Sequence, residues 1–327
     1  MDRQLKESQM RRVAELYYEQ NLSQQQIARI VGASHSTVSR LLNEARESGI
    51  VEIRIARRVE TSPAIARQLR RCFELRDVVV VPDAETAEGN LEAVGLAASE
   101  LLLSVVANGM IVGITWGYTL HHMVRQLKPV SLRDVEVIQL SGSLGQGDST
   151  VDGPRLAFSL AEHLGGTCRL LPAPAVVETA ELKDLLVNQK QIRATLTRAQ
   201  EANVIVQGIG ALADKESSLE RAGYITEEER VAAIENGAVG HVFARMIDEQ
   251  GKEVGDYSSR VIGVPLSALR NADWSICVSA SVQKAPAVLG ALRARYFNTL
   301  VIDEPSAHEV LRLAGFADSE PAMVRTA

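Results

Sequence analysis

Three glycine-rich segments each follow a short run of apolar residues, a spacing typical of the ligand-binding edge of a sheet. They are residues 113–119 (GITWGYT), 141–147 (SGSLGQG) and 208–210 (GIG). Glycine lets the backbone approach a ligand closely, and a helix that begins there offers free N–H groups to an anion. None of the three has the spacing of a dinucleotide-binding fingerprint or a Walker loop. We therefore predict a pocket for a small molecule at this edge, with the first segment as a phosphate cradle.

Two further polar residues stand near such strand ends. Lys284 opens a predicted helix after a predicted strand, so its ammonium can reach an anion at the same edge of the sheet. The alternative is a solvated lysine. His241 follows Gly237 and Gly240 in an apolar context, and it is either a ligand contact or a buried structural residue. Both residues are candidates for the pocket.

A different kind of motif occupies residues 22–46 (LSQQQIARIVGASHSTVSRLLNEAR). Ser23 and Gln26 have the spacing of a capping box at the start of a helix. Gly32 supplies the left-handed residue that ends this helix, and Ser34 can cap the next one. The pattern predicts two short helices joined by a tight turn.

The second of these helices carries an unusual set of exposed polar residues: Ser34, His35, Ser36, Thr37, Ser39 and Arg40. Small hydroxyl side chains let a helix enter the major groove and bond to phosphates and bases, and arginine reads base edges. An αα-hairpin that only packs against another element has no need for this combination. We therefore predict a helix-turn-helix that binds double-stranded DNA.

The distribution of charge separates the DNA-binding motif from the rest of the chain. The 327 residues suggest about two domains. Residues 1–60 carry ten Lys and Arg against eight Asp and Glu, whereas the remainder carries 25 against 33. A weakly basic head on an acidic body is typical of a small DNA-binding module attached to a domain with another task.

The body alternates helical patterns with short apolar runs, which indicates an α/β fold with a mostly parallel, Rossmann-like sheet covered on both faces. We predict helices at residues 64–73, 91–107, 119–127, 156–164, 182–201 and 287–295. We predict strands at residues 78–81, 110–114, 135–140, 168–171, 204–206, 275–278 and 300–302. Ligands of such sheets bind at the carboxyl ends of the strands, where the three glycine-rich segments lie.

The domain boundaries follow from this change of pattern. We predict a helix-turn-helix domain at residues 1–55, a linker at 56–62 and a ligand-binding domain at 63–327. Residues 50–55 (IVEIRI) alternate like a short strand, which is either a wing beside the DNA or the start of the linker. Arg54, Arg57 and Arg58 then either contact phosphates or are solvated.

Several classes of protein are disfavoured by the remaining residues. The three cysteines Cys72, Cys168 and Cys277 are far apart in apolar surroundings, as expected of reduced thiols in the cytoplasm. No stretch is long and apolar enough to span a membrane, and the polar N-terminal residues do not have the pattern of a signal peptide. The histidines show no metal-ligand spacing, and we expect neither a metal nor a cofactor.

A series of motifs in order along the chain resembles the SorC (SorC/DeoR-type) family of bacterial transcriptional regulators. They are VSRLLNEARESGIVEIRI, VGITWGYTL, QLSGSLG, QGIGAL, GAVGHVF, GVPLSAL and QKAPAVLGALRARYFNTLVIDEPSA. The resemblance implies a DNA-binding head and a sugar-binding domain similar in fold to sugar-phosphate isomerases and glucosamine-phosphate deaminases. It also implies a phosphorylated sugar or polyol as effector and assembly as dimers or tetramers.

The resemblance also implies the residues of the effector site. Carried over by motif, the pocket consists of Thr115, Gly117, Thr119, Ser141, Gly142, Ser143, His241 and Lys284, with Lys284 on the phosphate. Three positions depart from the family pattern. His35 stands where the family often has arginine, His241 stands where it usually has aspartate, and Ala280-Ser281 replaces a glycine pair. We therefore expect an unusual operator and an atypical ligand.

These observations favour a sequence-specific regulator, expected to be a repressor, of a carbohydrate or polyol catabolic operon. The main alternative is a sugar-phosphate enzyme with a DNA-binding head, which requires a general base beside the substrate. The carboxylates near the glycine-rich segments are Asp148, Asp152 and Glu178, and no sequence context singles out any of them. We therefore predict that the protein is not an enzyme. An architectural DNA protein fits poorly with a large acidic body.

Overall fold

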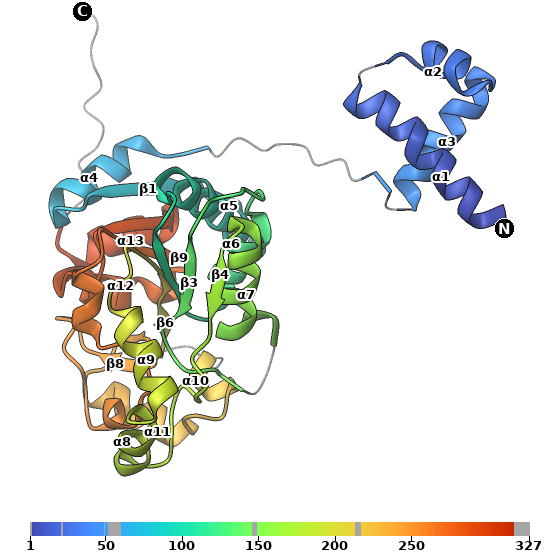
Figure 1. The fold of residues 1–327 in the computed structure, drawn as a ribbon. Coiled ribbons are helices and arrows are strands. Elements are labelled where there is room, and N and C mark those ends of the chain that lie inside the picture. The colour runs from blue at the N-terminus through green and yellow to red at the C-terminus, as the bar shows by residue number, and fades with distance from the viewer. Residues whose placement is uncertain are drawn as a thin grey trace, which may run out of the picture. The chain divides into compact units, whose positions relative to one another are not determined.

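The chain forms two compact units, Met1–Arg58 and Val59–Ala327, each described here by itself (Figure 1). The computed structural model describes residues 2–20, 22–48, 50–51, 60–145, 149–212 and 217–316. The predicted strand at 50–55 lies largely outside the described residues, as do Arg54, Arg57 and Arg58. The described Ile50 and Val51 do not form a strand, and they pack against the core of the first unit.

The first unit has the predicted helix-turn-helix. Its helices are α1 (Asp2–Ala14), which continues into a π-helical turn at Glu15–Glu19, α2 (Gln24–Val31) and α3 (His35–Glu47). Ser23 and Gln26 form the capping box of α2, and Gly32 ends this helix with a φ of 66°. Fully buried Ile27 and Val38 bring α2 and α3 onto one core with α1. The local signals in the sequence therefore specify this unit.

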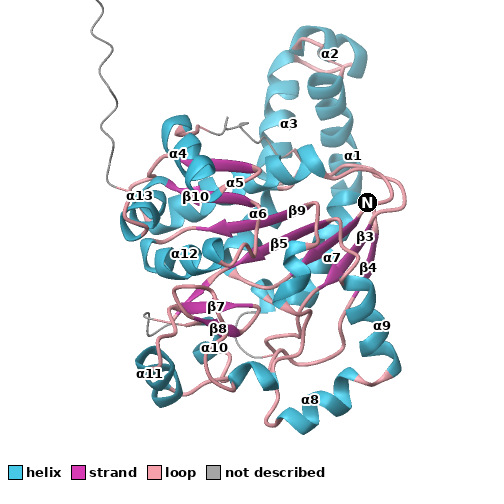
Figure 2. Ribbon diagram, turned by 90° about the vertical axis from the view of Figure 1, so that its left-hand side faces the viewer, coloured by secondary structure: helices cyan, strands magenta, loops and turns pink. Residues whose placement is uncertain are grey.

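A seven-stranded, wholly parallel sheet forms the centre of the second unit, in the order β1-β10-β9-β5-β2-β3-β4. This confirms the predicted fold class. The strands are β1 (Asp77–Val81), β2 (Ile111–Ile114), β3 (Glu136–Gln139), β4 (Thr167–Arg169), β5 (Val204–Gly208), β9 (Trp274–Ser279) and β10 (Thr299–Asp303). Because all strands run the same way, their carboxyl ends share one edge (Figure 2).

Helices cover both faces of this sheet, and the core divides accordingly into two clusters. One cluster packs beneath α5 (Ala87–Val105), α6 (Tyr118–Gln126) and α7 (Gly153–Leu164). The other packs beneath α4 (Pro63–Phe73), α9 (Lys190–Ala199), α12 (Ala285–Arg293) and α13 (Glu304–Leu313). The helix predicted at 182–201 is two helices, because α8 (Ala180–Val187) ends at Asn188 and the chain is extended at Gln189 before α9.

A small antiparallel sheet, absent from our prediction, lies beside the carboxyl edge of the large one. Its strands are β6 (Gly210–Ala211), β7 (Gly240–Val242) and β8 (Arg245–Ile247), accompanied by α10 (Ser218–Arg221) and α11 (Glu227–Glu235). These strands have two or three residues each, too few for a periodic pattern to show in the sequence. Trp116, Leu212 and Met246 form part of the core beneath them.

Three further observations concern membrane spans, thiols and metal clusters among the described residues. None of the described helices meets the length and hydropathy needed to traverse a bilayer. Cys72, Cys168 and Cys277 are free thiols, and burial raises the pKa of each. Within the described ranges, no cluster of three or more His, Cys, Asp or Glu side chains is arranged to hold a metal ion.

Candidate functional site

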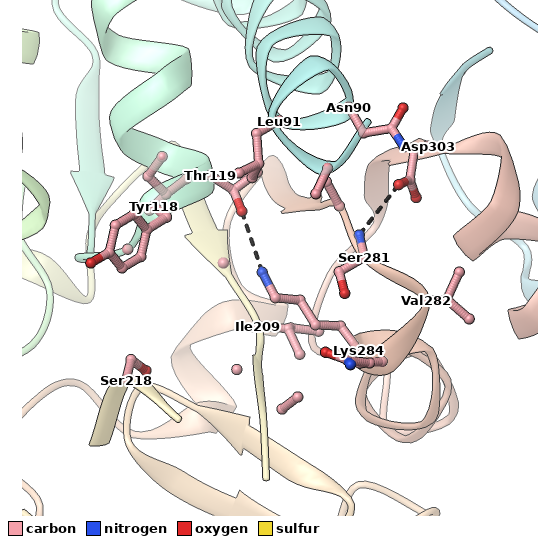
Figure 3. Close-up of a pocket in the computed structure, with 18 of the residues that line it drawn as sticks. Asn90, Leu91, Tyr118, Thr119, Ile209, Ser218, Ser281, Val282, Lys284 and Asp303 are labelled. Atoms are coloured by element: carbon pink, nitrogen blue, oxygen red, sulfur yellow. Dashed lines mark hydrogen bonds between the residues drawn. The ribbon is translucent and has the colours of Figure 1, made fainter. Parts of the chain in front are cut away.

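A cavity of about 470 Å³ lies at the carboxyl edge of the large sheet. Residues at or just beyond the ends of β1, β10, β9, β5 and β2 line it, and β7 and α10 contribute further side chains. Five of the eight predicted effector residues are among its lining: Thr115, Gly117, Thr119, His241 and Lys284. The predicted segment 208–210 also lines it. Sequence positions more than 200 residues apart, such as Asn90 and Asp303, thus meet in one hollow (Figure 3).

The N-terminus of α6 opens onto this cavity. Gly117 precedes the helix with a φ of 138°, which residues other than glycine rarely adopt. No side chain caps the first turn of α6. Thr115 and Thr119 are both 3% exposed. The first N–H groups of α6 are therefore left for a ligand, and the helix dipole favours one with negative charge.

Lys284 provides a cation at the same place. Its Nζ atom lies 3.5 Å from Thr119 Oγ1 and can donate a hydrogen bond to it. Burial lowers the pKa of Lys284 below its ordinary value; Cys277 and Asp303 oppose this shift, and the positive charge of Arg221 adds to it. Lys284 makes no ion pair within 4.0 Å with a carboxylate of the described residues. An anionic ligand in the cavity would add a direct charge-assisted contact to this ammonium.

The strand end before Lys284 keeps a glycine-like backbone although its sequence is Ala280-Ser281. Ser281 has a φ of 105°, and its N–H donates to Asp303 Oδ2 over 3.3 Å. A non-glycine residue in this region costs on the order of 1–3 kcal/mol. Ser281 therefore holds, at the cost of strain, a backbone conformation that glycine adopts more readily.

His241 lines the cavity from β7 and is 2% exposed. Its Nε2 lies 3.3 Å from Ser218 Oγ, and its ring centroid lies 5.8 Å from that of Trp116. Burial, with a smaller contribution from the charge of Lys284, lowers the pKa of His241 to about 3, so the imidazole is neutral at neutral pH. Gly210 is required beside it, because a Cβ there would overlap the ring.

The structure places Ser141, Gly142 and Ser143 outside the cavity lining. Gly142 packs so closely on the backbone of Pro174 that a Cβ would overlap its carbonyl group. The carboxylate of Asp152 accepts hydrogen bonds from the Ser143 hydroxyl and, over 2.8 Å, from the Leu144 N–H. This segment is therefore occupied by the protein's own groups, and here glycine marks close backbone packing instead of ligand access.

Two of the three carboxylates considered as catalytic bases, Asp152 and Glu178, lie in the described part of the chain. Asp152 holds the turn after β3, and it also accepts from the Gly153 N–H at the start of α7. Glu178 lines a separate hollow with Leu144 and Arg260. Asp148 lies outside the described residues. Neither described candidate is positioned as a general base in the 470 Å³ cavity.

In the first unit, the start of α3 presents the predicted DNA-contacting residues. The Ser34 hydroxyl accepts from the Thr37 N–H over 3.1 Å and lies 2.8 Å from Ser36 Oγ. His35, Ser36 and Arg40 are exposed, and Ser39 is half-buried. Ser34 and Thr37 thus act in the helix cap, while the other four point away from the core.

Several residues that line the cavity were missed by the sequence analysis. Asp303, Tyr118 and Arg221 line the cavity, and the Arg221 guanidinium lies 4.9 Å from the Tyr118 ring centroid. Asp303 directly follows a predicted strand, so its position was a usable signal. Arg221 lies in a segment without periodic pattern, and only the small sheet brings it to the cavity.

Comparisons with known proteins agree with this architecture. Residues 57–312 match a family described as "Putative sugar-binding domain", and residues 4–62 match a Crp-like helix-turn-helix domain. The chain is 32% identical over 303 residues to the deoxyribonucleoside regulator of Bacillus subtilis (strain 168), which covers 91% of this chain and 95% of that protein. It is 30% identical over 308 residues to the transcriptional regulator LsrR of Enterobacter sp. (strain 638), with 93% of each covered.

One solved structure shows the same likeness over nearly the whole chain, and another shows it over about three quarters of the chain. The full-length sorbitol operon regulator SorC from Klebsiella pneumoniae matches with a TM-score of 0.71 and 27% identity, covering 93% of this chain and 99% of that one. A probable sor operon regulator from Shigella flexneri matches with a TM-score of 0.71 and 25% identity, covering 76% of this chain and 99% of that one.

Proposed function

Because the chain belongs to the SorC/DeoR-type transcriptional regulators, which join a DNA-binding helix-turn-helix to a sugar-binding domain, we propose that a small phosphorylated sugar or polyol gates its binding to operator DNA. We propose further that it is a cytoplasmic repressor of a carbohydrate or polyol catabolic operon. His35, Ser36, Ser39 and Arg40 contact the operator, and Ser34 and Thr37 cap the helix that carries them.

The observation that carries the proposal is a cation and an uncapped helix N-terminus in one cavity. Its volume of about 470 Å³ lies within the range of roughly 300–1,000 Å³ that is usual for small-molecule sites. Lys284 and the first turn of α6 face the same space, and together they favour a phosphate group. A neutral sugar would offer Lys284 no charge-assisted hydrogen bond.

The cavity wall formed by His241 is suited to the carbohydrate part of the ligand. A neutral imidazole at His241 donates from one nitrogen and accepts at the other, whereas the aspartate usual in the family only accepts. The ring keeps its Nε2 near Ser218, and Trp116 lies beside it. This wall therefore favours a ligand whose hydroxyl and carbonyl groups are arranged differently from those of a ligand that binds an aspartate.

Gating requires that the ligand bind two arrangements of an oligomer with different affinity. We propose a dimer or tetramer in which the ligand changes the spacing of paired α3 helices. Half-sites on DNA lie about 34 Å or a multiple apart, so a modest change disengages one helix. The coupling free energy in such systems is typically about 1–3 kcal/mol.

A thermal-shift screen tests the proposal with phosphorylated sugars and polyols, each beside its unphosphorylated parent. A ligand that binds only the folded protein raises the melting temperature with concentration. We expect stabilisation by at least one phosphorylated compound and none by its parent, followed by loss of operator DNA in a gel shift. Stabilisation by the unphosphorylated parents alone would contradict the proposal that the ligand carries a phosphate. A protein that does not bind its own promoter DNA would contradict the proposal that it binds an operator.

A further inference from the structure

The exposed face of α3 extends beyond the residues considered so far. The helix turns its buried side chains Val38, Leu41, Leu42 and Ala45 toward the core of the first unit. With 3.6 residues per turn, the opposite side carries Ser36, Ser39, Arg40 and Asn43. This spacing of i, i+3, i+4 and i+7 is the one with which a homeodomain's recognition helix reads base edges. Asn43 therefore continues the reading face by one helical turn.

Two of the nearer polar residues are already engaged within the protein. The Ser34 hydroxyl bonds to the Thr37 N–H and lies 2.8 Å from Thr37 Oγ1, so this pair completes the cap of α3. Asn43, by contrast, is exposed. From Ser36 to Asn43 the helix rises about 10 Å, which corresponds to roughly three base-pair steps of ~3.4 Å.

The side-chain amide of Asn43 has a neighbouring guanidinium as a hydrogen-bond partner. Arg46 Nη2 donates a hydrogen bond to Asn43 Oδ1. The oxygen keeps a second lone pair, and Nδ2 keeps both of its hydrogens, because no described residue accepts from it. An acceptor and a donor side by side are what the major-groove edge of adenine requires, since its N6 donates and its N7 accepts.

We propose that Asn43 reads an adenine in each operator half-site through a bidentate pair of hydrogen bonds, and that Arg46 is the positioning residue for its amide. This rests on the proposed docking of α3 in the major groove and is independent of the effector. Arg40, whose side chain is 70% exposed one turn earlier, then reads a neighbouring base pair.

Selection from a random duplex DNA library with the full-length protein tests the assignment. We expect the wild type to select adenine at one position of each half-site, and Asn43→Ala to lose this preference by about tenfold while other positions stay unchanged. Asn43→Asp should shift the preference to cytosine, because a carboxylate accepts from its amino group. Arg46→Ala should weaken the same position and no other.

A matched control is Gln9→Ala, which removes an exposed amide from α1 and should leave the selected sequence unchanged. An Asn43→Ala protein that selects the wild-type sequence at every position overturns the proposal. So does a uniform loss of affinity for all sequences, which marks a phosphate contact. If Arg40→Ala also selects the wild-type sequence, α3 is not the reader, and the proposed DNA-binding mode fails with it.

Discussion

Two glycine-rich turns follow the neighbouring strands β2 and β3, and the structure uses them in opposite ways. After β2, Gly117 has open space around it and leads into an uncapped helix at the wall of the cavity. After β3, Gly142 is packed against Pro174, and the carboxylate of Asp152 takes the N–H groups of the turn. The two turns look alike in sequence, yet among the described residues only the first lines the 470 Å³ cavity.

Glycine at a strand end therefore indicates that the backbone lies close to another group. The glycine alone does not show whether that group is a ligand or another part of the protein. At the first turn no described atom lies within 4 Å of a Cβ built at Gly117, and at the second the neighbour is another loop together with Asp152. Asp152 is an internal substitute for an anionic ligand, bound by the same kind of backbone N–H groups that would bind a phosphate. The following predictions separate the open turn from the filled one.

The largest effect should come from adding a methyl group at the filled turn. Gly142→Ala forces a Cβ into the Pro174 carbonyl, and backbone cannot move aside cheaply, so we expect a loss of about 3 kcal/mol in the free energy of unfolding. Its control, Gly208→Ala, lies on the cavity wall with space for a Cβ. Urea denaturation should leave Gly208→Ala near wild type, and equal losses in both variants would contradict the distinction.

Removing the cation from the open site should weaken the ligand without weakening the fold. Lys284→Ala deletes a buried ammonium whose pKa is lowered by burial, so we expect unfolding free energy to be unchanged or slightly higher. Affinity for the phosphorylated ligand should fall by at least about tenfold, as for loss of one charge-assisted contact. Calorimetric titration measures this, with the exposed Lys190→Ala as control. An unchanged titration curve would take Lys284 out of the site.

Replacing the Asp152 carboxylate by an amide should weaken the fold without weakening ligand binding. Asp152→Asn weakens the hydrogen bonds to Leu144 and Gly153, so we expect a loss of about 2 kcal/mol in unfolding free energy, typical for bonds to a charged group. Ligand affinity should stay within about twofold, because Asp152 does not line the cavity. A large loss of ligand affinity in a stable Asp152→Asn protein would show that the turn after β3 does contribute to the site.

A smaller effect should appear in the pH dependence of stability. His241 has a pKa of about 3 in the folded protein, below its ordinary value of 6.5, so the unfolded chain binds the proton more tightly. Stability from this group is therefore fully present above pH 6.5 and declines toward pH 3, by roughly 1 kcal/mol per pH unit. Denaturation between pH 4 and 7 should show a shallower slope for His241→Gln than for the wild type. Identical slopes would mean that the imidazole is not buried as described.

The sequence predicted the parts of this molecule that are encoded locally. The caps at Ser23 and Ser34, the turn at Gly32 and most strands of the parallel sheet follow from neighbouring residues. The strand predicted at 168–171 lies at Thr167–Arg169, a shift of one or two residues. Such features need no knowledge of distant contacts.

The parts that escaped prediction depend on distant contacts. The small sheet pairs Gly210 with His241, and only that pairing creates the far wall of the cavity. The exclusion of Ser141, Gly142 and Ser143 depends on Pro174 and Asp152, which no local pattern links to them. Four of the five predicted effector residues in the cavity, all except His241, meet there because the carboxyl ends of parallel strands share one edge, which is a property of the fold class.

The central claim is that a phosphorylated ligand in the cavity changes the affinity of the helix-turn-helix for DNA. Fluorescence anisotropy of labelled operator DNA measures this affinity with and without saturating ligand. We expect a ligand-dependent change of roughly 5- to 150-fold in the wild type, and none in Lys284→Ala at the same ligand concentration. An operator affinity that stays the same while the wild-type cavity is saturated would contradict it.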